Sequence, residues 1–312
     1  MAWLSRGDRQ TGSPSLNIEE VFHYAPFDIE YFRLGQQFAR VGRGDGPGTS
    51  WNMAEYVEAW LSQLEEALSD VIFEKDENAE LTPITRWAEN VGPEDSVVTF
   101  NYDTLVERAL DGVGKVWNHA MPKEENLGIA VCKLLGSIDW IVAHRSDRLS
   151  KLVPLFEKTN ENAKGKDTGN VEDDCLLWRC QPRDRLRKWI SGRFVQGASP
   201  ENVGIAGLGT YKQLHQIPGS VYPWSRGMDA LYKADVGVVV GFSMSEFDAM
   251  AQMQFAGVAR KRSEARRPLS IVVVDPSADA ATEKRFRRVF ETVRFERCRH
   301  EEFDWSSLRS GA

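Results

Sequence analysis

The sequence has few cysteines, no excess of basic residues and no long apolar run. Its four cysteines, Cys132, Cys175, Cys180 and Cys298, are too few and too scattered for a disulfide scaffold. Cys175 and Cys180 have no second Cys or His pair at a zinc-finger spacing, so we expect no metal site. No run of about 20 apolar residues is present to cross a bilayer, and the first residues show no apolar signal region. We therefore expect a cytoplasmic protein that does not associate with membranes.

The net charge limits the ligands further. The chain has 39 Lys and Arg against 46 Asp and Glu, which gives a formal net charge of −7. Nucleic-acid-binding proteins hold phosphate backbones with clustered basic side chains, so this balance argues against that class. Two local basic runs, 260–262 and 284–288, are typical of solvated helix faces. A nucleic-acid accessory protein is therefore the weakest of the alternatives.

The chain divides into a polar tail, a helical segment and an alternating core. Residues 1–16 are polar and rich in turn formers. Residues 17–92 show helical periodicity, with apolar side chains at steps of three and four and a glycine-rich stretch at 41–48. The core spans 93–305, and near 145–174 it contains a polar, aperiodic stretch that we interpret as a surface insertion.

Strand and helix patterns alternate along the core. The predicted strands are 96–101, 115–120, 129–136, 236–243, 269–276 and 293–298. Amphipathic helices lie between them, and continuous apolar strands in such an alternation are typical of a parallel sheet covered on both faces. The sequence therefore predicts an α/β fold: a Rossmann-like parallel sheet with helices on both faces, plus a helical insertion.

Polar residues follow three of the predicted strands. Ligands of parallel sheets bind at the carboxyl ends of the strands. Asn101 and Asp103 stand at a strand-to-helix turn, where a helix cap is the alternative role. Gly241 lets a backbone approach closely, and Ser243 offers a hydroxyl before the next helix. Asp275 closes a third strand, where it either accepts ribose hydroxyls or forms a plain turn.

Three segments, in order, resemble the sirtuin-like (silent information regulator-like) family, most closely its bacterial branch from anti-phage defence. Residues 99–107 match T-x-N-Y-D-x-x-x-E, and residues 133–140, KLLGSIDW, are similar to K-L-H-G-S-x-x-W. Residues 234–248 match an A-D-x-x-x-x-x-G-x-S pattern that ends in Asp. The resemblance covers roughly residues 17–277.

The resemblance implies NAD as the substrate or ligand. Members of the defence branch hydrolyse NAD to nicotinamide and ADP-ribose, whereas the zinc module of the lysine-deacylating members is not visible here. By this resemblance Asn101 holds the nicotinamide ribose or directs a water molecule, and Asp103 fixes the turn. The remaining residues implied to line the cofactor site are Thr99, Gly241, Ser243 and Asp275.

Two departures from the family pattern bear on activity. Leu135 stands at the position of the family's catalytic histidine and has no titratable proton, so it cannot act as a general base. His119 is the alternative base. The family's first strand and Gly-Ala-Gly pyrophosphate loop have no counterpart before Asn17, and the glycines at 42–48 follow a predicted helix. Two interpretations stay open: an NAD hydrolase with an impaired site, or a non-catalytic module that binds NAD, an ADP-ribose-like molecule, a protein partner or a second copy.

Overall fold

The computed structural model describes residues 69, 71–122, 128–144, 153–157, 175–179, 202–206, 217, 219–244 and 248–308. The predicted tail at 1–16 and most of the predicted helical segment at 17–92, including the glycine-rich stretch, lie outside these residues. Residues 71–77 are helical, and α3 (Thr82–Asn90) follows them. Both helices fall within the segment 17–92 for which the sequence predicts helical structure.

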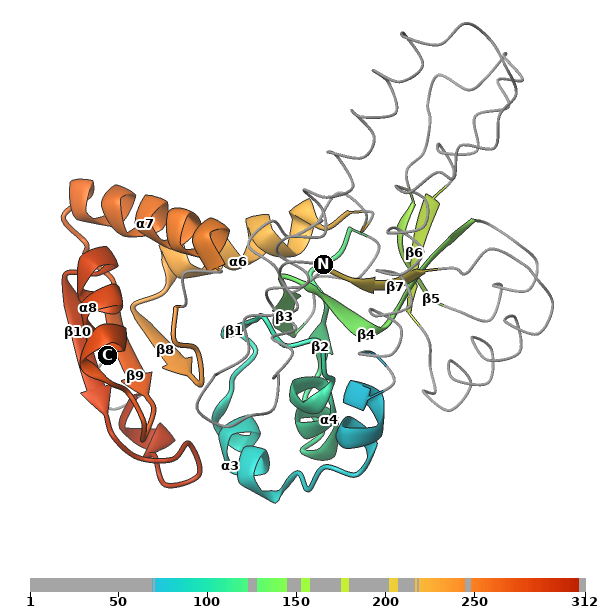
Figure 1. Cartoon of the computed structure of the whole chain (residues 1–312), viewed down its shortest axis with the longest axis horizontal. Coiled ribbons are helices and arrows are strands. Elements are labelled where there is room, and N and C mark those ends of the chain that lie inside the picture. Colours follow the sequence, from blue (N-terminus) through green and yellow to red (C-terminus); the bar gives the residue numbers. More distant parts are fainter. Residues whose placement is uncertain are drawn as a thin grey trace, which may run out of the picture.

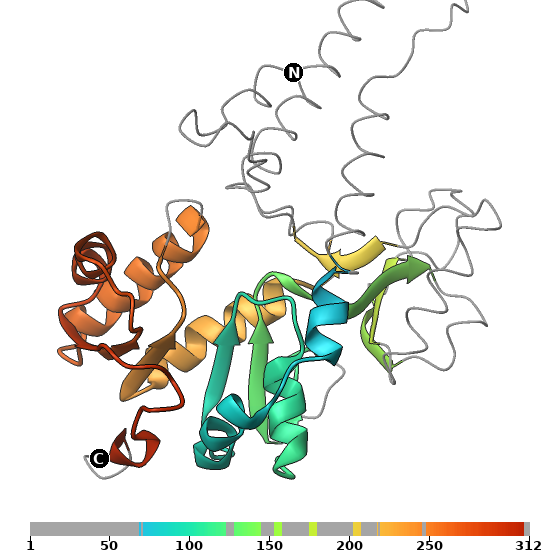
Figure 2. The ribbon, with the colours of Figure 1, turned by 60° about the horizontal axis from the view of Figure 1, so that its bottom comes forward.

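The described strands form three sheets, which lie side by side in two views (Figures 1 and 2). The first has the order β1-β3-β2 and is parallel, with bounds β1 (Ser96–Thr99), β2 (Trp117–Asn118) and β3 (Ile129–Lys133). The second has the order β10-β9-β8 and is also parallel, with bounds β8 (Val236–Val240), β9 (Ser270–Val274) and β10 (Thr292–Glu296). The third has the order β5-β6-β4-β7 and is antiparallel, with bounds β4 (Gly136–His144), β5 (Val153–Glu157), β6 (Cys175–Arg179) and β7 (Asn202–Ile205).

Helices cover both faces of the first parallel sheet. Successive strand residues point to opposite faces, and the buried residues of β3 divide in this way. Ile129 and Val131 pack with the side chains of α3 and α4 (Leu105–Gly112). Ala130 and Cys132 belong to the larger core cluster, to which α6 (Val221–Lys233) contributes Trp224. A strand buried on both faces explains why this segment is almost entirely apolar.

In the second parallel sheet, the buried residues of the central strand are likewise divided between two packed faces. On β9, Ile271 and Val273 join the cluster that contains residues of α7 (Ala249–Glu264) and α8 (Ala280–Val289). Val272 and Val274 face the opposite side and pack with Trp305 of the short 3-10 helix η6 (Trp305–Leu308). The predicted Rossmann-like α/β fold, with parallel strands flanked by helices, is confirmed.

The parallel strands nevertheless form two half-sheets. Among the described residues, β1 and β8 do not pair with each other, although each lies at the edge of its half that is nearer the other half (Figures 1 and 2). Aromatic side chains connect the two edges instead. The rings of Phe100, directly after β1, and Phe242, just after β8, stack with centroids 4.6 Å apart and planes 6° apart. Phe255 of α7 meets both rings edge-on at 6.2 Å.

The antiparallel sheet was not predicted. The strand expected at 129–136 ends at Lys133, and β4 begins at Gly136 after a two-residue turn. Gly136 adopts φ +88°, and a Cβ there would overlap the carbonyl of Gly204 on β7, so the chain can turn closely only with glycine. β5 lies inside the stretch interpreted as a surface insertion and pairs with β6.

Candidate functional site

The turn after β1 brings three of the predicted residues together. The Oγ1 atom of Thr99 accepts a hydrogen bond from the backbone N–H of Asn101 at 3.0 Å. Oδ1 of Asp103 accepts one from the backbone N–H of Leu105, the first residue of α4, at 3.1 Å. Asp103 therefore forms an Asx turn directly before α4, whose N-cap residue is Thr104. Asn101 is exposed, so its amide is open to a ligand.

Hydrogen bonds from neighbouring segments hold the backbone of this turn. The N–H of Leu134 donates to the carbonyl of Thr99 at 2.9 Å, and the N–H of Ile138 donates to the carbonyl of Tyr102 at 3.0 Å. The Tyr102 hydroxyl donates to the carbonyl of Ala206 at 2.5 Å. Nζ of Lys133 donates to the carbonyl of Asp103. The backbone of the turn is thus preorganised by contacts that leave Asn101 at the surface.

Leu135 lies in the two-residue turn between β3 and β4. It is 5% exposed and belongs to the main core cluster. Its carbonyl accepts a hydrogen bond from the N–H of Ala206 at 2.8 Å, so the backbone is held to the segment after β7. An apolar side chain in this place contributes packing and cannot move a proton.

The loop after β8 carries two more predicted residues. Gly241 has φ +63° and Ser243 is exposed. The carbonyl of Ser243 accepts a hydrogen bond from Nε of Arg285 at 2.9 Å, and the carbonyl of Met244 accepts one from Nε2 of Gln252 at 3.2 Å. Side chains from α8 and α7 therefore hold this loop. Sequence reasoning missed Arg285, because it lies 42 residues beyond Ser243 and no local pattern connects them.

The two turns share one edge of the molecule. Phe100 lies between Thr99 and Asn101, Phe242 lies between Gly241 and Ser243, and their rings are stacked. The two turns follow the carboxyl ends of β1 and β8, and the stacked rings place them next to each other. This is the arrangement in which α/β proteins bind ligands.

Asp275 directly follows β9, beside Gly241 in the sheet register, but its carboxylate is engaged in a turn of its own. Its Oδ1 accepts hydrogen bonds from the N–H and the hydroxyl of Ser277, at 2.8 and 2.7 Å. Its own N–H donates to the carbonyl of Glu296, on the β10 side of the sheet. Among the described residues, no hydrogen bond joins Asp275 to the Gly241–Ser243 loop. The carboxylate thus forms a local turn, the alternative role that its position suggested.

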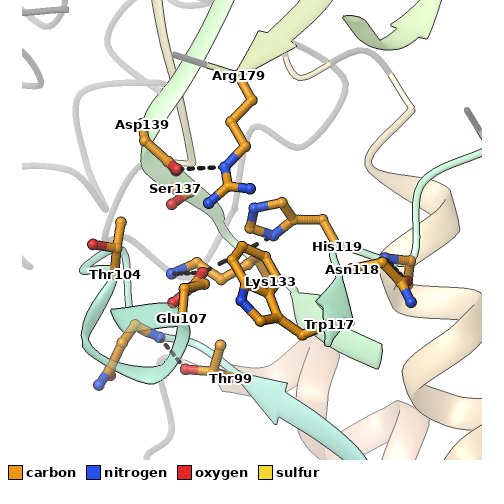
Figure 3. Close-up of polar contacts among 12 residues, drawn as sticks. Thr99, Thr104, Glu107, Trp117, Asn118, His119, Lys133, Ser137, Asp139 and Arg179 are labelled. Carbon is orange, nitrogen blue, oxygen red and sulfur yellow. Dashed lines mark hydrogen bonds and ion pairs between the residues drawn. The ribbon is translucent and has the colours of Figure 1, made fainter. Parts of the chain in front are cut away.

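A buried group of charged side chains lies behind the β1 turn (Figure 3). Nζ of Lys133 is 3.3 Å from Oε1 of Glu107, and Nε of Arg179 is 3.0 Å from Oδ2 of Asp139. Nδ1 of His119 is 4.0 Å from Oε1 of Glu107. Two acidic side chains thus face a lysine, an arginine and a histidine. We call these five residues the buried charge cluster.

Burial sets the ionisation of this cluster. Desolvation raises the pKa of Glu107, although the charge of Lys133 opposes the shift. Desolvation and the charge of Arg179 lower the pKa of His119 well below its usual value. Desolvation also opposes ionisation of Asp139, but Arg179 and the other polar neighbours outweigh it and lower the pKa to about 2. His119 is therefore uncharged at neutral pH.

His119 does not supply the missing base. Its side chain is 0% exposed, and its ring lies edge-on between Trp117 at 5.0 Å and Trp140 at 5.3 Å. Arg179 lies over the Trp117 ring with its Cζ 4.4 Å from the centroid. A base must come within hydrogen-bond reach of the proton that it removes, and these rings enclose the imidazole. The cluster therefore belongs to the core beside the predicted site.

Lys133 is the residue that a closer look at the sequence could have identified. It interrupts an apolar run that predicts a buried strand, and a charged side chain in such a strand needs a partner.

Within the described ranges, no group of three or more His, Cys, Asp or Glu side chains is arranged to hold a metal ion. None of the described helices has the length and apolar character needed to cross a membrane.

No family model and no curated protein matches this chain. The resemblance to the sirtuin-like family therefore stays a prediction from the three quoted segments.

Proposed function

We propose that this protein binds NAD or an ADP-ribose-like nucleotide at the carboxyl ends of β1 and β8, without efficient hydrolysis. The stack of Phe100 on Phe242 carries this proposal, because it places two polar turns at one edge of the parallel strands. The resemblance of residues 99–107 and 234–248 to nucleotide-binding segments supports the same location.

The exposed polar groups at this edge suit a sugar and its phosphates. The Asn101 amide has both donor and acceptor atoms for ribose hydroxyls, and its backbone is fixed by Thr99. The Ser243 hydroxyl is exposed on the facing loop, and Gly241 has open space where a side chain would stand. A ligand can therefore approach the backbone closely at Gly241.

The residues that remain around the edge favour binding over catalysis. Leu135 is apolar and buried, and His119 is enclosed by tryptophan rings. The carboxylates of Asp103 and Asp275 accept hydrogen bonds within their own turns. General base catalysis contributes about 10²–10⁴-fold to an enzymatic rate, so hydrolysis without it is slow. In the alternative, Asn101 orients a water molecule that attacks NAD, and the reaction proceeds without a general base.

Calorimetric titration with NAD and ADP-ribose tests the binding site. We expect the wild-type chain to bind at least one of them, and Asn101→Ala to weaken that binding. Asn78→Ala is the matched control, since Asn78 is exposed and bonds only locally to the carbonyl of Glu74. Equal affinities for the wild-type chain and Asn101→Ala would refute the assigned site, and no binding by the wild-type chain would refute the function.

Nicotinamide release distinguishes binding from hydrolysis. We expect none from the wild-type chain, and the same assay on Leu135→His asks whether an imidazole at this position restores turnover. Release by the wild-type chain, abolished by Asn101→Ala, would establish the hydrolase alternative instead. If neither ligand binds and no nicotinamide is released, a protein-interaction module becomes the better account.

A further inference from the structure

Arg285 is a fixed guanidinium group beside the loop that follows β8. Its Nε donates to the carbonyl of Ser243 at 2.9 Å, and its Nη2 donates to Oγ1 of Thr282 at 2.8 Å. Its helix, α8, is itself capped, because Oδ1 of Asp279 accepts a hydrogen bond from the N–H of Thr282 at 2.7 Å. Two hydrogen bonds on one planar group fix its orientation as well as its position.

Among the described residues Arg285 has no close ion pair, although its charge helps to lower the pKa of Asp279, the exposed residue that caps the same helix. Three other arginines near it in sequence have carboxylate partners: Arg294 with Glu296 at 2.9 Å, Arg297 with Glu283 at 2.6 Å, and Arg299 with Glu301 at 3.7 Å. Among the described residues, no carboxylate oxygen lies within 4.0 Å of the Arg285 nitrogens. A guanidinium has five N–H groups, and the two hydrogen bonds above use two of them. Three N–H donors of the guanidinium therefore remain for a ligand.

We propose that Arg285 recognises a phosphate group of the ligand at the carboxyl ends of β1 and β8, so that the site selects phosphorylated nucleosides. This inference rests on the proposed nucleotide site and adds the ligand class to it. Arginine suits this role because its planar fork of N–H groups matches two oxygens of one phosphate. The guanidinium is already held against the Ser243 carbonyl, so little freedom is lost when a phosphate binds.

The same guanidinium also positions the loop, and the two roles make different predictions. Loss of a positioning contact changes the loop, and it weakens every ligand that touches Gly241 or Ser243. Loss of a phosphate contact weakens only ligands that carry a phosphate. A series of ligands that differ in phosphorylation therefore separates the two roles.

The test is calorimetric titration of adenosine, AMP and ADP-ribose into the wild-type chain, Arg285→Met and Arg288→Met. Arg288 is the matched control because it is exposed on the same helix and its loss changes the net charge equally. We expect the wild-type chain to prefer AMP and ADP-ribose over adenosine. Arg285→Met should weaken both phosphorylated ligands by about tenfold or more and leave adenosine nearly unchanged, since hydrogen bonds to charged groups have this strength. Arg288→Met should bind like the wild-type chain.

The other outcomes separate a failure of this inference from a failure of the proposed function on which it rests. If Arg285→Met binds all three ligands as the wild-type chain does, or weakens adenosine and AMP equally, phosphate recognition by Arg285 is refuted while the nucleotide site stands. If the wild-type chain binds none of the three, the proposed function fails, and inorganic pyrophosphate becomes the probe. Pyrophosphate binding that is lost in Arg285→Met and kept in Arg288→Met would support anion recognition by Arg285 alone. If the wild-type chain does not bind pyrophosphate, anion recognition by Arg285 is refuted. Thermal unfolding of each variant by circular dichroism verifies that it folds.

Discussion

Lys133 of β3 and Glu107 of α4 form an ion pair in the core, with Nζ 3.3 Å from Oε1 and side chains only 1% and 2% exposed. The same ammonium group donates to the carbonyl of Asp103, in the turn that presents Asn101. The pair thus connects the packing of a helix on the sheet to the shape of the candidate site.

Replacing Lys133 by methionine should destabilise the protein strongly. The substitution keeps the volume of the side chain but leaves the Glu107 carboxylate buried without its cation. Breaking one partner of a buried pair typically costs about 3–5 kcal/mol of the free energy of unfolding. Urea denaturation at neutral pH measures this change. The Glu107→Gln/Lys133→Met double variant removes both charges and should recover part of the loss, and an unchanged midpoint for Lys133→Met would show that the pair contributes nothing.

The parallel part of the fold can be predicted from the sequence because its signals are local. Helix α3 has a proline in its first turn and ends just before Gly92-Pro93, which are local signals of a helix start and a helix end. The strands β8 and β9 are short runs rich in valine between amphipathic helices, which is the pattern of a sheet covered on both faces. Alternation of buried residues on β3 and β9 then follows from strand geometry alone.

The candidate site is less predictable because its contacts are long-range. Asn101 and Ser243 can be placed at strand ends, but only the structure shows that Phe100 and Phe242 bring them to one edge. Arg285 reaches its loop across 42 residues of sequence. The buried charge cluster was missed for a similar reason, since Lys and Glu are exposed in most proteins and their burial depends on partners from other elements.

Protonation of His119 should make the protein less stable as the pH falls below 6.5. Desolvation and Arg179 lower the pKa of the folded histidine well below 6.5, so it stays neutral, whereas the unfolded chain takes up a proton near pH 6.5. The unfolded state then binds more protons, and stability decreases with falling pH by up to about 1.4 kcal/mol per pH unit from this group.

Urea denaturation of the wild-type chain and His119→Phe at about pH 7.5 and about pH 5.5 measures this contribution. Phenylalanine keeps an aromatic ring between Trp117 and Trp140 and cannot titrate. We expect the wild-type chain to lose more stability than the variant between the two pH values. Equal losses would mean that the folded His119 takes up a proton as readily as the unfolded one.

Gly136 should tolerate no side chain. It adopts φ +88°, and a Cβ there would overlap the Gly204 carbonyl, so Gly136→Ala has to move β4 away from β7. The left-handed conformation and the overlap together should cost about 3 kcal/mol. Gly114→Ala is the control, since Gly114 has φ +70° with open space around it and should lose only about 1 kcal/mol. Chemical denaturation compares the two, and equal losses would show that the close approach of β4 and β7 is relaxed in solution.

The Phe100–Phe242 stack should be measurable as a coupling energy between the two half-sheets. Their rings lie 4.6 Å apart and nearly parallel, and aromatic pairs contribute about 0.5–1.5 kcal/mol beyond the area that they bury. We expect the losses of unfolding free energy in Phe100→Leu and Phe242→Leu to be non-additive by that amount in the double variant. Phe303 packs in a different cluster with Val272, so Phe242→Leu and Phe303→Leu should be additive within about 0.5 kcal/mol. If Phe100 and Phe242 are additive as well, the stack does not join the halves. The common edge on which the proposed nucleotide site depends would then lack its support.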